Sequence, residues 1–463
     1  MDRPYVCRAA RCSQPTDAAD HRTRQSGISG DLTMDALSRR KFLIASGVTG
    51  ATALAAGAGG IALADLLSSA APEAAATARD ILVVVTLYGG NDGLNTVIPY
   101  ADSAYHSARP ELGYEPESVL PIDAELGLNP VLTGLRTLWG DGQLAIVSGV
   151  GYPKPDRSHF RSMDIWQTGS PTNPANSGWI GRWLDGIKAP VEAAVSFEPV
   201  LPPLLVGRSR IGACVSYRGL RVPDWIDPQV VAALGASHPQ ESPMRARAAA
   251  AYADLIEMAR TVRSAQELAD PFPADDDLDS LAASATGTGG SGALGTQLGL
   301  VARCVTLGVP TRMYSVSLGG FDTHAQERVG QELLLGQLDR ALTGFVRAMS
   351  ASPAGQRVTV VVYSEFGRRV RANASDGTDH GTAGPVLVAG PAVAGGRFGE
   401  QPSLADLDDG DLKATVDFRD IFGTLLARVL EAEPARYLDG YEPVELPLLR
   451  TERGPASVDH PTD

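Results

Sequence analysis

Short apolar runs alternate along the chain with longer segments in which apolar residues recur at helical spacing. Continuous apolar runs are typical of strands covered on both faces of a sheet, and they occupy residues 81–87, 144–150, 313–318, 358–363 and 386–390. The helical spacing is found in residues 130–139 and 327–349. This alternation predicts an α/β fold, a three-layer α/β/α sandwich on a mostly parallel sheet.

The first part of the chain has the pattern of an export signal. Paired arginines in SRRKFL, at 38–43, precede an Ala/Gly-rich apolar stretch at 44–67, and small residues at 76–78 could form a cleavage site. The pattern predicts a twin-arginine signal peptide over 34–78, transport by the twin-arginine export machinery, and a periplasmic, cell-wall or extracellular location with no stable membrane anchor after cleavage. An uncleaved anchor is the alternative, because the stretch is long enough to span a bilayer.

The rest of the chain is expected to form one domain over 79–450. Residues 1–33 lack apolar periodicity and are an unstructured leader or a mis-assigned start, and 451–463 form a tail. A flexible loop is predicted at 270–299, where Asp, Ala, Ser and Gly dominate.

Composition narrows the class of protein. The 463 residues are 44% hydrophobic and 20% charged, as in soluble globular proteins. The formal net charge of -14 excludes a general nucleic-acid binder, which needs a surplus of Lys and Arg. Outside the leader, Cys214 and Cys304 remain and no CxxC spacing occurs, so a thiolate zinc site is not expected and a disulfide is not established.

Acids, histidines and a hydroxyl lie beside glycines next to the predicted strands. Asp92 follows the first strand, Ser158 and His159 the second, Asp322 and His324 the third, and Glu365 the fourth, while Asp379 and His380 precede the fifth. Because the carboxyl ends of parallel strands share one edge of a sheet, these residues are expected to meet in one cleft.

Six of these residues could bind metal: Asp92, Asp322, His324, Glu365, Asp379 and His380. Oxygen and imidazole donors suit zinc, manganese, magnesium or calcium, and two such ions a few ångströms apart can clamp a transferring phosphoryl group. We therefore predict one or two divalent ions. The alternatives are that Asp92 and Asp379 are ordinary turn residues and that His324 and His380 are hydrogen-bonded structural histidines.

Several motifs give the chain a family resemblance: VVVTLYGGNDGLN, RSHFRSMDIWQTG, SGWIGRWLD, SVSLGGFDTHAQ, VVYSEFGRRV and GTDHGTAGP. Together they resemble the exported bacterial family catalogued as domain of unknown function fifteen-oh-one, often labelled sulfatase-like. That family is similar, more remotely, to the alkaline phosphatase and sulfatase superfamily. The resemblance implies an alkaline-phosphatase-like fold.

The superfamily pattern implies metal ligands at several of these positions. Asp92 resembles its first-strand ligand, and His380 resembles its last metal histidine. Asp322 and His324 resemble a metal-binding Asp and His pair. Glu365 can replace the superfamily's aspartate, but the next residue is Phe366 where that pattern has a histidine, so one imidazole is missing. Asp379 substitutes for it, or the second metal is lost.

The same pattern implies a nucleophile. Thr168-Gly169 resembles the Thr-Gly pair that follows it, and counting back without a gap reaches His159, whereas a shift of one residue reaches Ser158. Coordination to a metal would activate the Ser158 hydroxyl; the alternative is that Ser158 caps the following helix. Since no cysteine lies near this motif, sulfatase chemistry through an oxidised cysteine is disfavoured.

Arginines follow Glu365 and could hold an anionic substrate. Arg368 is the predicted substrate-binding residue because it is closest to the strand end; the alternative is that these arginines make solvated surface pairs.

The sequence thus predicts an exported metal-dependent hydrolase that acts on a small or polymer-borne phosphate or sulfate ester, with no nucleic-acid partner. A non-catalytic, metal-stabilised binding or cell-surface assembly protein of the same fold is the alternative. A metal-free Ser-His-Asp hydrolase is weaker, because no GxSxG motif occurs.

Overall fold

The computed structural model describes residues 66–67, 69–70, 79–173, 175–215 and 294–450, all of which belong to the compact unit Gly50–Asp463. The predicted leader, nearly all of the signal peptide and the tail lie outside the described residues, so the export signal stays a prediction. Residues 270–293 of the predicted loop also lie outside them.

The end of that loop prediction is wrong. Residues 294–299 begin helix α10 (Leu294–Leu307), in which Leu294, Leu298 and Val301 are buried. The small residues in this segment favour a loop, but the burial of its regularly spaced apolar residues stabilises the helix by more than the small residues destabilise it.

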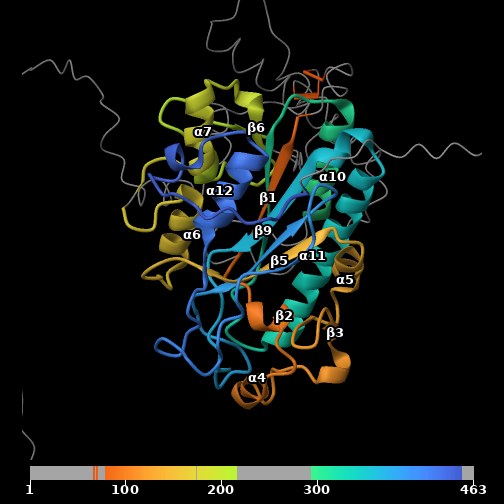
Figure 1. Ribbon diagram of the computed structural model, residues 1–463, viewed down its shortest axis with the longest axis vertical. Coiled ribbons are helices and arrows are strands. Elements are labelled where there is room, and N and C mark those ends of the chain that lie inside the picture. Colours follow the sequence, from red (N-terminus) through yellow and green to blue (C-terminus); the bar gives the residue numbers. More distant parts are fainter. Residues whose placement is uncertain (1–65, 68, 71–78, 174, 216–293, 451–463) are drawn as a thin grey trace, which may run out of the picture. The chain divides into compact units, whose positions relative to one another are not determined.

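A mixed sheet of nine strands forms the centre of the described unit (Figure 1). Its order is β11-β5-β10-β9-β1-β8-β6-β7, and β12 also pairs with β5. Neighbouring strands are parallel, except that β10 is antiparallel to both β9 and β5. The strands are β1 (Ile81–Tyr88), β5 (Leu144–Gly151), β6 (Ala194–Ser196), β7 (Ala213–Cys214), β8 (Met313–Gly319), β9 (Val358–Ser364), β10 (Gly384–Ala389), β11 (Gly396–Phe398) and β12 (Val416–Asp417).

Both faces of the sheet are covered, which explains the continuous apolar runs. Every residue of β1 is buried. Val83 and Val85 belong to the core on one face, whereas Leu82 and Val84 belong to the core on the other. Since successive side chains of a strand point to opposite faces, a strand between two helical layers is apolar at nearly every position, and in β1 Thr86 is the exception. The predicted three-layer α/β/α sandwich on a mostly parallel sheet is confirmed.

The helices divide between the two faces (Figure 1). The layer of α5, α10 and α11 packs on one face, and the layer of α6, α7 and α12 on the other. Besides α10, the helices are α4 (Ser103–Ala108), α5 (Thr133–Gly140), α6 (His159–Thr168), α7 (Trp179–Ile187), α11 (Glu327–Ser350) and α12 (Phe418–Arg428).

A small antiparallel sheet and α4 form a third, smaller core with the loops around them, in which Ile98 and Tyr105 are buried. Its strands are β2 (Val97–Ile98), β3 (Leu120–Pro121) and β4 (Gly127–Leu128). Short 3-10 helices occupy Gly93–Asn95, Pro116–Ser118, Val191–Ala193, Pro203–Leu205, Pro353–Arg357 and Pro434–Arg436.

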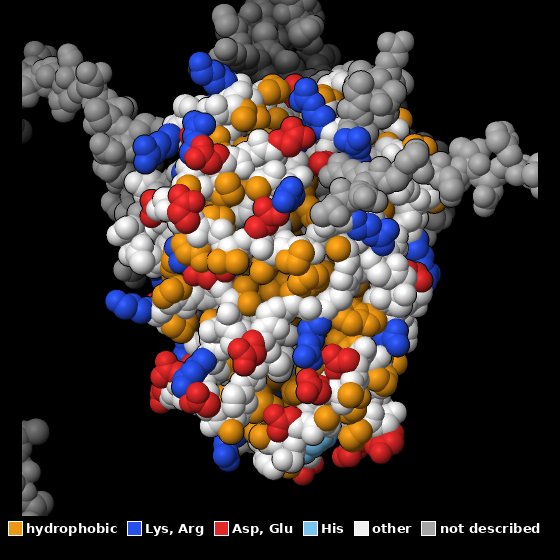
Figure 2. All heavy atoms as spheres, viewed as in Figure 1, with side chains coloured by type: hydrophobic (Ala, Val, Ile, Leu, Met, Phe, Trp, Pro, Cys, Tyr) orange, Lys and Arg blue, Asp and Glu red, His pale blue; other side chains and the backbone are white. Residues whose placement is uncertain are grey.

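On the face shown in Figure 2, basic side chains are interspersed with acidic ones and with apolar patches. None of the helices in the described ranges is long and apolar enough to cross a membrane.

Candidate metal centre

The strand directions bring the predicted site residues to one edge of the sheet. Strands β1, β8 and β9 are parallel and end at Tyr88, Gly319 and Ser364. Strand β10 is antiparallel to β9, so its first residue lies at the same edge, and the preceding segment that contains His380 must cross there. Helix α6, which begins at His159, follows β5 at this edge as well.

Two glycines allow these loops to approach closely. Gly89 has a φ of 120°, and a Cβ there would lie 2.5 Å from the backbone nitrogen of Asp322. A Cβ on Gly377 would lie 2.4 Å from the carbonyl carbon of His324. Neither contact would tolerate a side chain, so both positions favour glycine.

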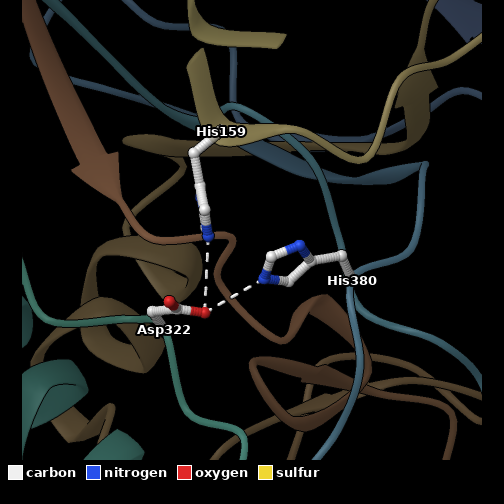
Figure 3. A group of neighbouring side chains, drawn as sticks. All are labelled: His159, Asp322 and His380. Atoms are coloured by element: carbon white, nitrogen blue, oxygen red, sulfur yellow. Dashed lines mark hydrogen bonds and ion pairs between the residues drawn. The ribbon is translucent and has the colours of Figure 1, made fainter. Parts of the chain in front are cut away.

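Three side chains from separate segments of the chain form a group that could hold a metal ion: His159, Asp322 and His380 (Figure 3). One donor atom from each lies within 4.8 Å of the others. Oδ1 of Asp322 is 3.1 Å from Nε2 of His380 and 3.4 Å from Nε2 of His159. We call these residues the triad.

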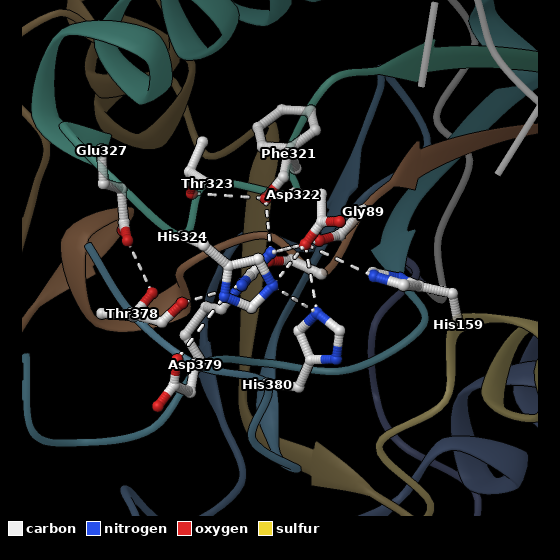
Figure 4. Close-up of polar contacts among 12 residues, drawn as sticks. Gly89, His159, Phe321, Asp322, Thr323, His324, Glu327, Thr378, Asp379 and His380 are labelled. Carbon is white, nitrogen blue, oxygen red and sulfur yellow. Dashed lines mark hydrogen bonds and ion pairs between the residues drawn. The ribbon is translucent and has the colours of Figure 1, made fainter. Parts of the chain in front are cut away.

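His324 lies beside the triad (Figure 4). Its Nε2 is 3.0 Å from Oδ1 of Asp322 and 2.9 Å from Nε2 of His380. Around a tetrahedral ion with bonds of about 2.0–2.1 Å, neighbouring ligand atoms lie about 3.3 Å apart. The spacings in this cluster are therefore close to those of atoms that share one ion.

The outer nitrogens of the imidazoles face acceptors. Nδ1 of His159 is 2.8 Å from Oε1 of Glu365, and Nδ1 of His380 is 2.9 Å from the carbonyl oxygen of Arg157. Such an acceptor keeps the proton on Nδ1 and leaves the Nε2 lone pair free, which is the usual arrangement around metal-binding histidines.

The chemistry of the donors fits a divalent ion. Nε2 of His159 is buried, and its contact with Oδ1 of Asp322, at 3.4 Å, is longer than a good hydrogen bond. A buried polar atom that is only weakly paired is costly in a folded protein. Two imidazole nitrogens and a carboxylate oxygen are a donor set that suits zinc.

Within the triad, the contact between His159 and Asp322 shifts the pKa values of both side chains. Burial lowers the pKa of His159, but its contacts with Asp322 and Glu365 outweigh burial and raise it to about 9. Burial raises the pKa of Asp322, but His159, His380 and Arg368 outweigh this and hold it well below its usual range. The negative charges of Asp322 and Glu365 thus favour a positive charge at this position, carried either by a second proton on His159 or by a metal ion bound to its Nε2.

Glu365 lies behind His159. The carboxylate is buried, and Oε1 accepts from the backbone N–H of Gly89 at 2.9 Å as well as facing His159. Ser364 donates to the other oxygen at 3.0 Å. In this position Glu365 orients the imidazole of His159. This predicted ligand therefore contacts the Nδ1 side of the ring and not the Nε2 side that faces Asp322.

Asp92, another predicted ligand, lies in a different cluster. Both of its carboxylate oxygens accept from the guanidinium of Arg109, and both side chains are buried. Burial raises the pKa of Asp92, but Arg109 outweighs burial and lowers it. Because a guanidinium already neutralises this carboxylate, the structure places Asp92 in a buried ion pair rather than among the histidines.

Arg368 is not available to a substrate. Its side chain is fully buried, and all of its nitrogens donate within the chain. The acceptors are the carbonyl oxygens of Gly89, Gly90, Phe321 and Thr378 and Oδ1 of Asp322. The expectation of substrate binding by Arg368 is corrected: this guanidinium joins three loops and holds Asp322 in place.

Ser158 and Asp379 are both exposed. Ser158 is the residue before α6, but its side chain makes no capping hydrogen bond. Asp379 lies 3.5 Å from Nδ1 of His324, and its carboxylate is 61% exposed. A nucleophilic role for Ser158 and a ligand role for Asp379 stay predictions.

The third residue of the triad, His159, lies beside Phe366, the residue that occupies the position where the resemblance implies a histidine. The sequence placed His159 at the nucleophile position, because counting back without a gap from Thr168-Gly169 reaches it, and it left the histidine position occupied by Phe366 without a substitute other than Asp379. In the structure the Phe366 ring packs beside both His159 and His380, with its centre 4.9 Å from each imidazole centre, while the two imidazole centres are 4.3 Å apart. A local pattern could not reveal this contact, because His159 and Phe366 are brought together by the fold alone.

Nothing in the sequence singled out Arg157 and Asp411, which also contribute to the site. The carbonyl group of Arg157 accepts from His380, and the Arg157 side chain pairs with Asp411. A cavity of about 450 Å³ borders this ion pair, with Arg157, Phe366, Asp409, Asp411 and Lys413 among its lining residues.

The fold and this group of side chains define an α/β protein with a candidate metal centre at the carboxyl edge of its sheet. The chain belongs to the family described as "Protein of unknown function (DUF1501)", whose model matches residues 147–437, more than half of the chain. No match was found among the curated proteins.

Solved structures similar to the chain include a protein in the alkaline phosphatase superfamily from Vibrio parahaemolyticus, at 9% identity over 79% of this chain and 71% of that chain, with a TM-score of 0.35. The lipoteichoic acid synthase LtaP from Listeria monocytogenes matches at 10% identity, 84% and 80% coverage and a TM-score of 0.32. The phosphonate monoester hydrolase SpPMH from Silicibacter pomeroyi matches at 10% identity, 80% and 78% coverage and a TM-score of 0.32. At these TM-scores, none of them assigns a substrate to this chain.

Proposed function

We propose that the chain is a metal-dependent hydrolase of phosphate or sulfate esters, and that the triad holds one divalent ion, for which zinc is the best fit. The observation that carries the proposal is the convergence of Nε2 of His159 and Nε2 of His380 on Oδ1 of Asp322. Manganese, magnesium and calcium suit the site less well, because they favour sites richer in oxygen.

A bound divalent ion would supply Lewis acidity towards an ester oxygen. The chain's own residues prepare the site for it. Glu365 orients His159, and the Arg157 carbonyl orients His380. Arg368 fixes Asp322 without reaching solvent. In this proposal the exposed hydroxyl of Ser158, next to His159 in the chain, is the candidate nucleophile.

The test is hydrolysis of generic phosphate, phosphonate and sulfate esters by the purified chain, with metal, after chelation and after metal is restored. We expect turnover that chelation removes and zinc restores. Ser158→Ala should abolish turnover while metal content stays unchanged, since ligation by imidazole and carboxylate does not need the hydroxyl. Wild-type protein that binds metal but hydrolyses none of the esters would contradict the enzymatic proposal.

A second function is favoured by the position of His324. If His324 joins the triad as a fourth ligand, the site is closed, and closed tetrahedral sites are structural in most proteins. The chain would then be a metal-stabilised binding or surface-assembly protein. His324→Ala distinguishes the two: a marked loss of metal affinity favours the closed site, whereas retained affinity favours an open, catalytic one.

The location of the protein is a separate proposal, supported by SRRKFL and the apolar stretch that follows it. We propose export by the twin-arginine route. Changing Arg39 and Arg40 together to Lys should leave the precursor in the cytoplasm. Fractionation that finds the double variant exported like the wild type would overturn the assignment.

A further inference from the structure

We propose that the ion pair between Arg157 and Asp411 is a positioning device for the triad. The pair holds Arg157 in place. Arg157 precedes His159 by two residues, and its carbonyl group orients His380. This inference rests on the proposed role of the triad in metal binding. We call the pair the clamp; neither of its residues is a ligand.

The contacts within the clamp are charge-assisted. Nε of Arg157 donates to Oδ2 of Asp411 at 2.7 Å, and a terminal nitrogen of the guanidinium donates to the same oxygen. The Asp411 side chain is 2% exposed, whereas that of Arg157 is 39% exposed. Asp409 also lies near this guanidinium, but at 3.4 Å and with a side chain that is 82% exposed. Buried, hydrogen-bonded charge pairs are worth more than exposed ones, so Asp411 is the partner that holds Arg157.

The main chain of Arg157 connects the clamp to the imidazoles of His159 and His380. Its carbonyl oxygen accepts from Nδ1 of His380 at 2.9 Å. His159 follows two residues later as the first residue of α6. A shift of Arg157 would therefore displace His159 and release His380 together.

The Asp411 end of the clamp is anchored to the sheet. Asp408 and Asp411 exchange backbone hydrogen bonds of 3.0 Å, which closes their turn. Further along, the Thr415 N–H donates to the carbonyl oxygen of Gly149, and Val416 in β12 pairs with Val150 in β5. Asp411 is thus a fixed point, and Arg157 is the residue that it positions.

The consequence for metal binding follows from the chemistry of imidazole. When Nδ1 of His380 donates to a carbonyl group, Nε2 keeps its lone pair for a metal ion. Loss of such an outer partner typically lowers metal affinity 10–100-fold. The cavity that borders Arg157 and Asp411 gives water access to a weakened pair, so a neutral substitution at Asp411 is expected to leave the chain folded.

The experiment compares Asp411→Asn with the matched control Asp409→Asn in the full mature chain. The first readout needs no metal: the ¹⁵N imidazole spectrum of the metal-free protein, in which His380→Ala identifies the signal of His380. We expect a slowly exchanging Nδ1–H on His380 in the wild type and in Asp409→Asn, and its loss in Asp411→Asn. The second readout is zinc affinity, which should fall 10–100-fold in Asp411→Asn and stay unchanged in the control.

Arg157→Gln tests the clamp from its other side and keeps the proposal testable if Asp411→Asn does not fold. It should match Asp411→Asn in both readouts, the double variant should lose no more zinc affinity than either single variant, and Arg157→Lys should recover part of the loss. The cobalt-loaded variants should also show an altered visible spectrum, which a purely structural role would leave unchanged.

Two results separate this inference from the proposed function. A wild type that binds no zinc, but whose His380 signal depends on Asp411, would refute the metal site and support the clamp. Zinc binding in the wild type with an unchanged His380 signal and unchanged affinity in both Asp411→Asn and Arg157→Gln would overturn the clamp. Equal losses in Asp409→Asn and Asp411→Asn would overturn it as well.

Discussion

Two polar clusters lie at the carboxyl edge of the sheet, and they satisfy their charges in opposite ways. In the buried cluster, Asp92 and Arg109 neutralise each other. Glu327 is also buried there, and its carboxyl group accepts from Thr378 at 2.6 Å. In the triad, Nε2 of His159 is only weakly paired, at 3.4 Å from Oδ1 of Asp322, and the side chains of Asp322 and His380 are 28% and 22% exposed.

The difference shows which carboxylate is available to a ligand. Asp92 and Asp322 are both strand-end acids beside glycines, and the sequence predicts the same role for both. Arg109 binds both carboxylate oxygens of Asp92 in the buried cluster. Asp322 is partly exposed, and its Oδ1 faces the Nε2 atoms of the imidazoles as well as one nitrogen of Arg368. Burial and pairing of both oxygens therefore separate a structural acid from a candidate ligand.

The largest expected effect concerns the stability of the buried cluster. Arg109→Met removes the charge that compensates Asp92, and breaking a buried pair in this way typically costs about 3–5 kcal/mol. Denaturant unfolding of the metal-free chain should show this loss. Zinc affinity of the folded variant should be unchanged, and a large loss of zinc affinity with normal stability would erase the distinction between the clusters.

The triad should show the opposite behaviour. His380→Ala removes a ligand, so zinc affinity should fall by more than the roughly 10–100-fold that an outer partner is worth. Unfolding of the metal-free variant should be close to that of the wild type, because this side chain is partly exposed. The rise in melting temperature that zinc gives the wild type should be absent, since a ligand stabilises only a protein that binds it. Equal zinc-induced shifts in both proteins would argue against the triad.

Glu327 sharpens the comparison through pH. Burial, and then Asp92, raise the pKa of Glu327 from its ordinary 4.5 to about 9. The folded chain thus holds a proton that the unfolded chain releases, so this group makes stability fall as pH rises from about 4.5 to about 9. Glu327→Gln should flatten that decline in the free energy of unfolding. A decline as steep as in the wild type would show that Glu327 is not its source.

A smaller effect on zinc affinity is expected from Glu365, which contacts His159 but is not a member of the triad. Glu365→Gln keeps an oxygen that can accept from His159 and Gly89 but removes the charge, so zinc affinity should drop roughly 10–100-fold. Isothermal titration can measure it beside Glu332→Gln, a matched change on α11 away from the triad. Equal affinities in Glu365→Gln and the wild type would remove Glu365 from the centre.

Much of the fold was predictable because its determinants are local. The run that forms β1 is apolar at every position except Thr86, and α11 has apolar residues at helical spacing, although Val329 and Leu333 are exposed. The strand-end positions of Asp322 and His324 followed from the parallel sheet. The antiparallel direction of β10 explains why His380 reaches the same edge.

The partners of these side chains were not predictable, because pairing across the fold leaves no local pattern. Arg109 lies 17 positions from Asp92 in the chain, and nothing in its surroundings marks it as the counter-ion. The sequence predicted that Arg368 binds substrate, whereas in the structure five oxygens of neighbouring loops enclose its guanidinium. His159 had the sequence position of a nucleophile but has the geometry of a ligand.

The measurement that tests the central claim most directly is the zinc content of the purified mature chain, determined by elemental analysis after dialysis against a small excess of zinc. The triad predicts one zinc ion per wild-type chain and much less than one per chain of Asp322→Asn, with Asp92→Asn retaining the wild-type value if it folds. A wild-type chain without zinc, or with zinc that depends on Asp92 and not on Asp322, would contradict the account.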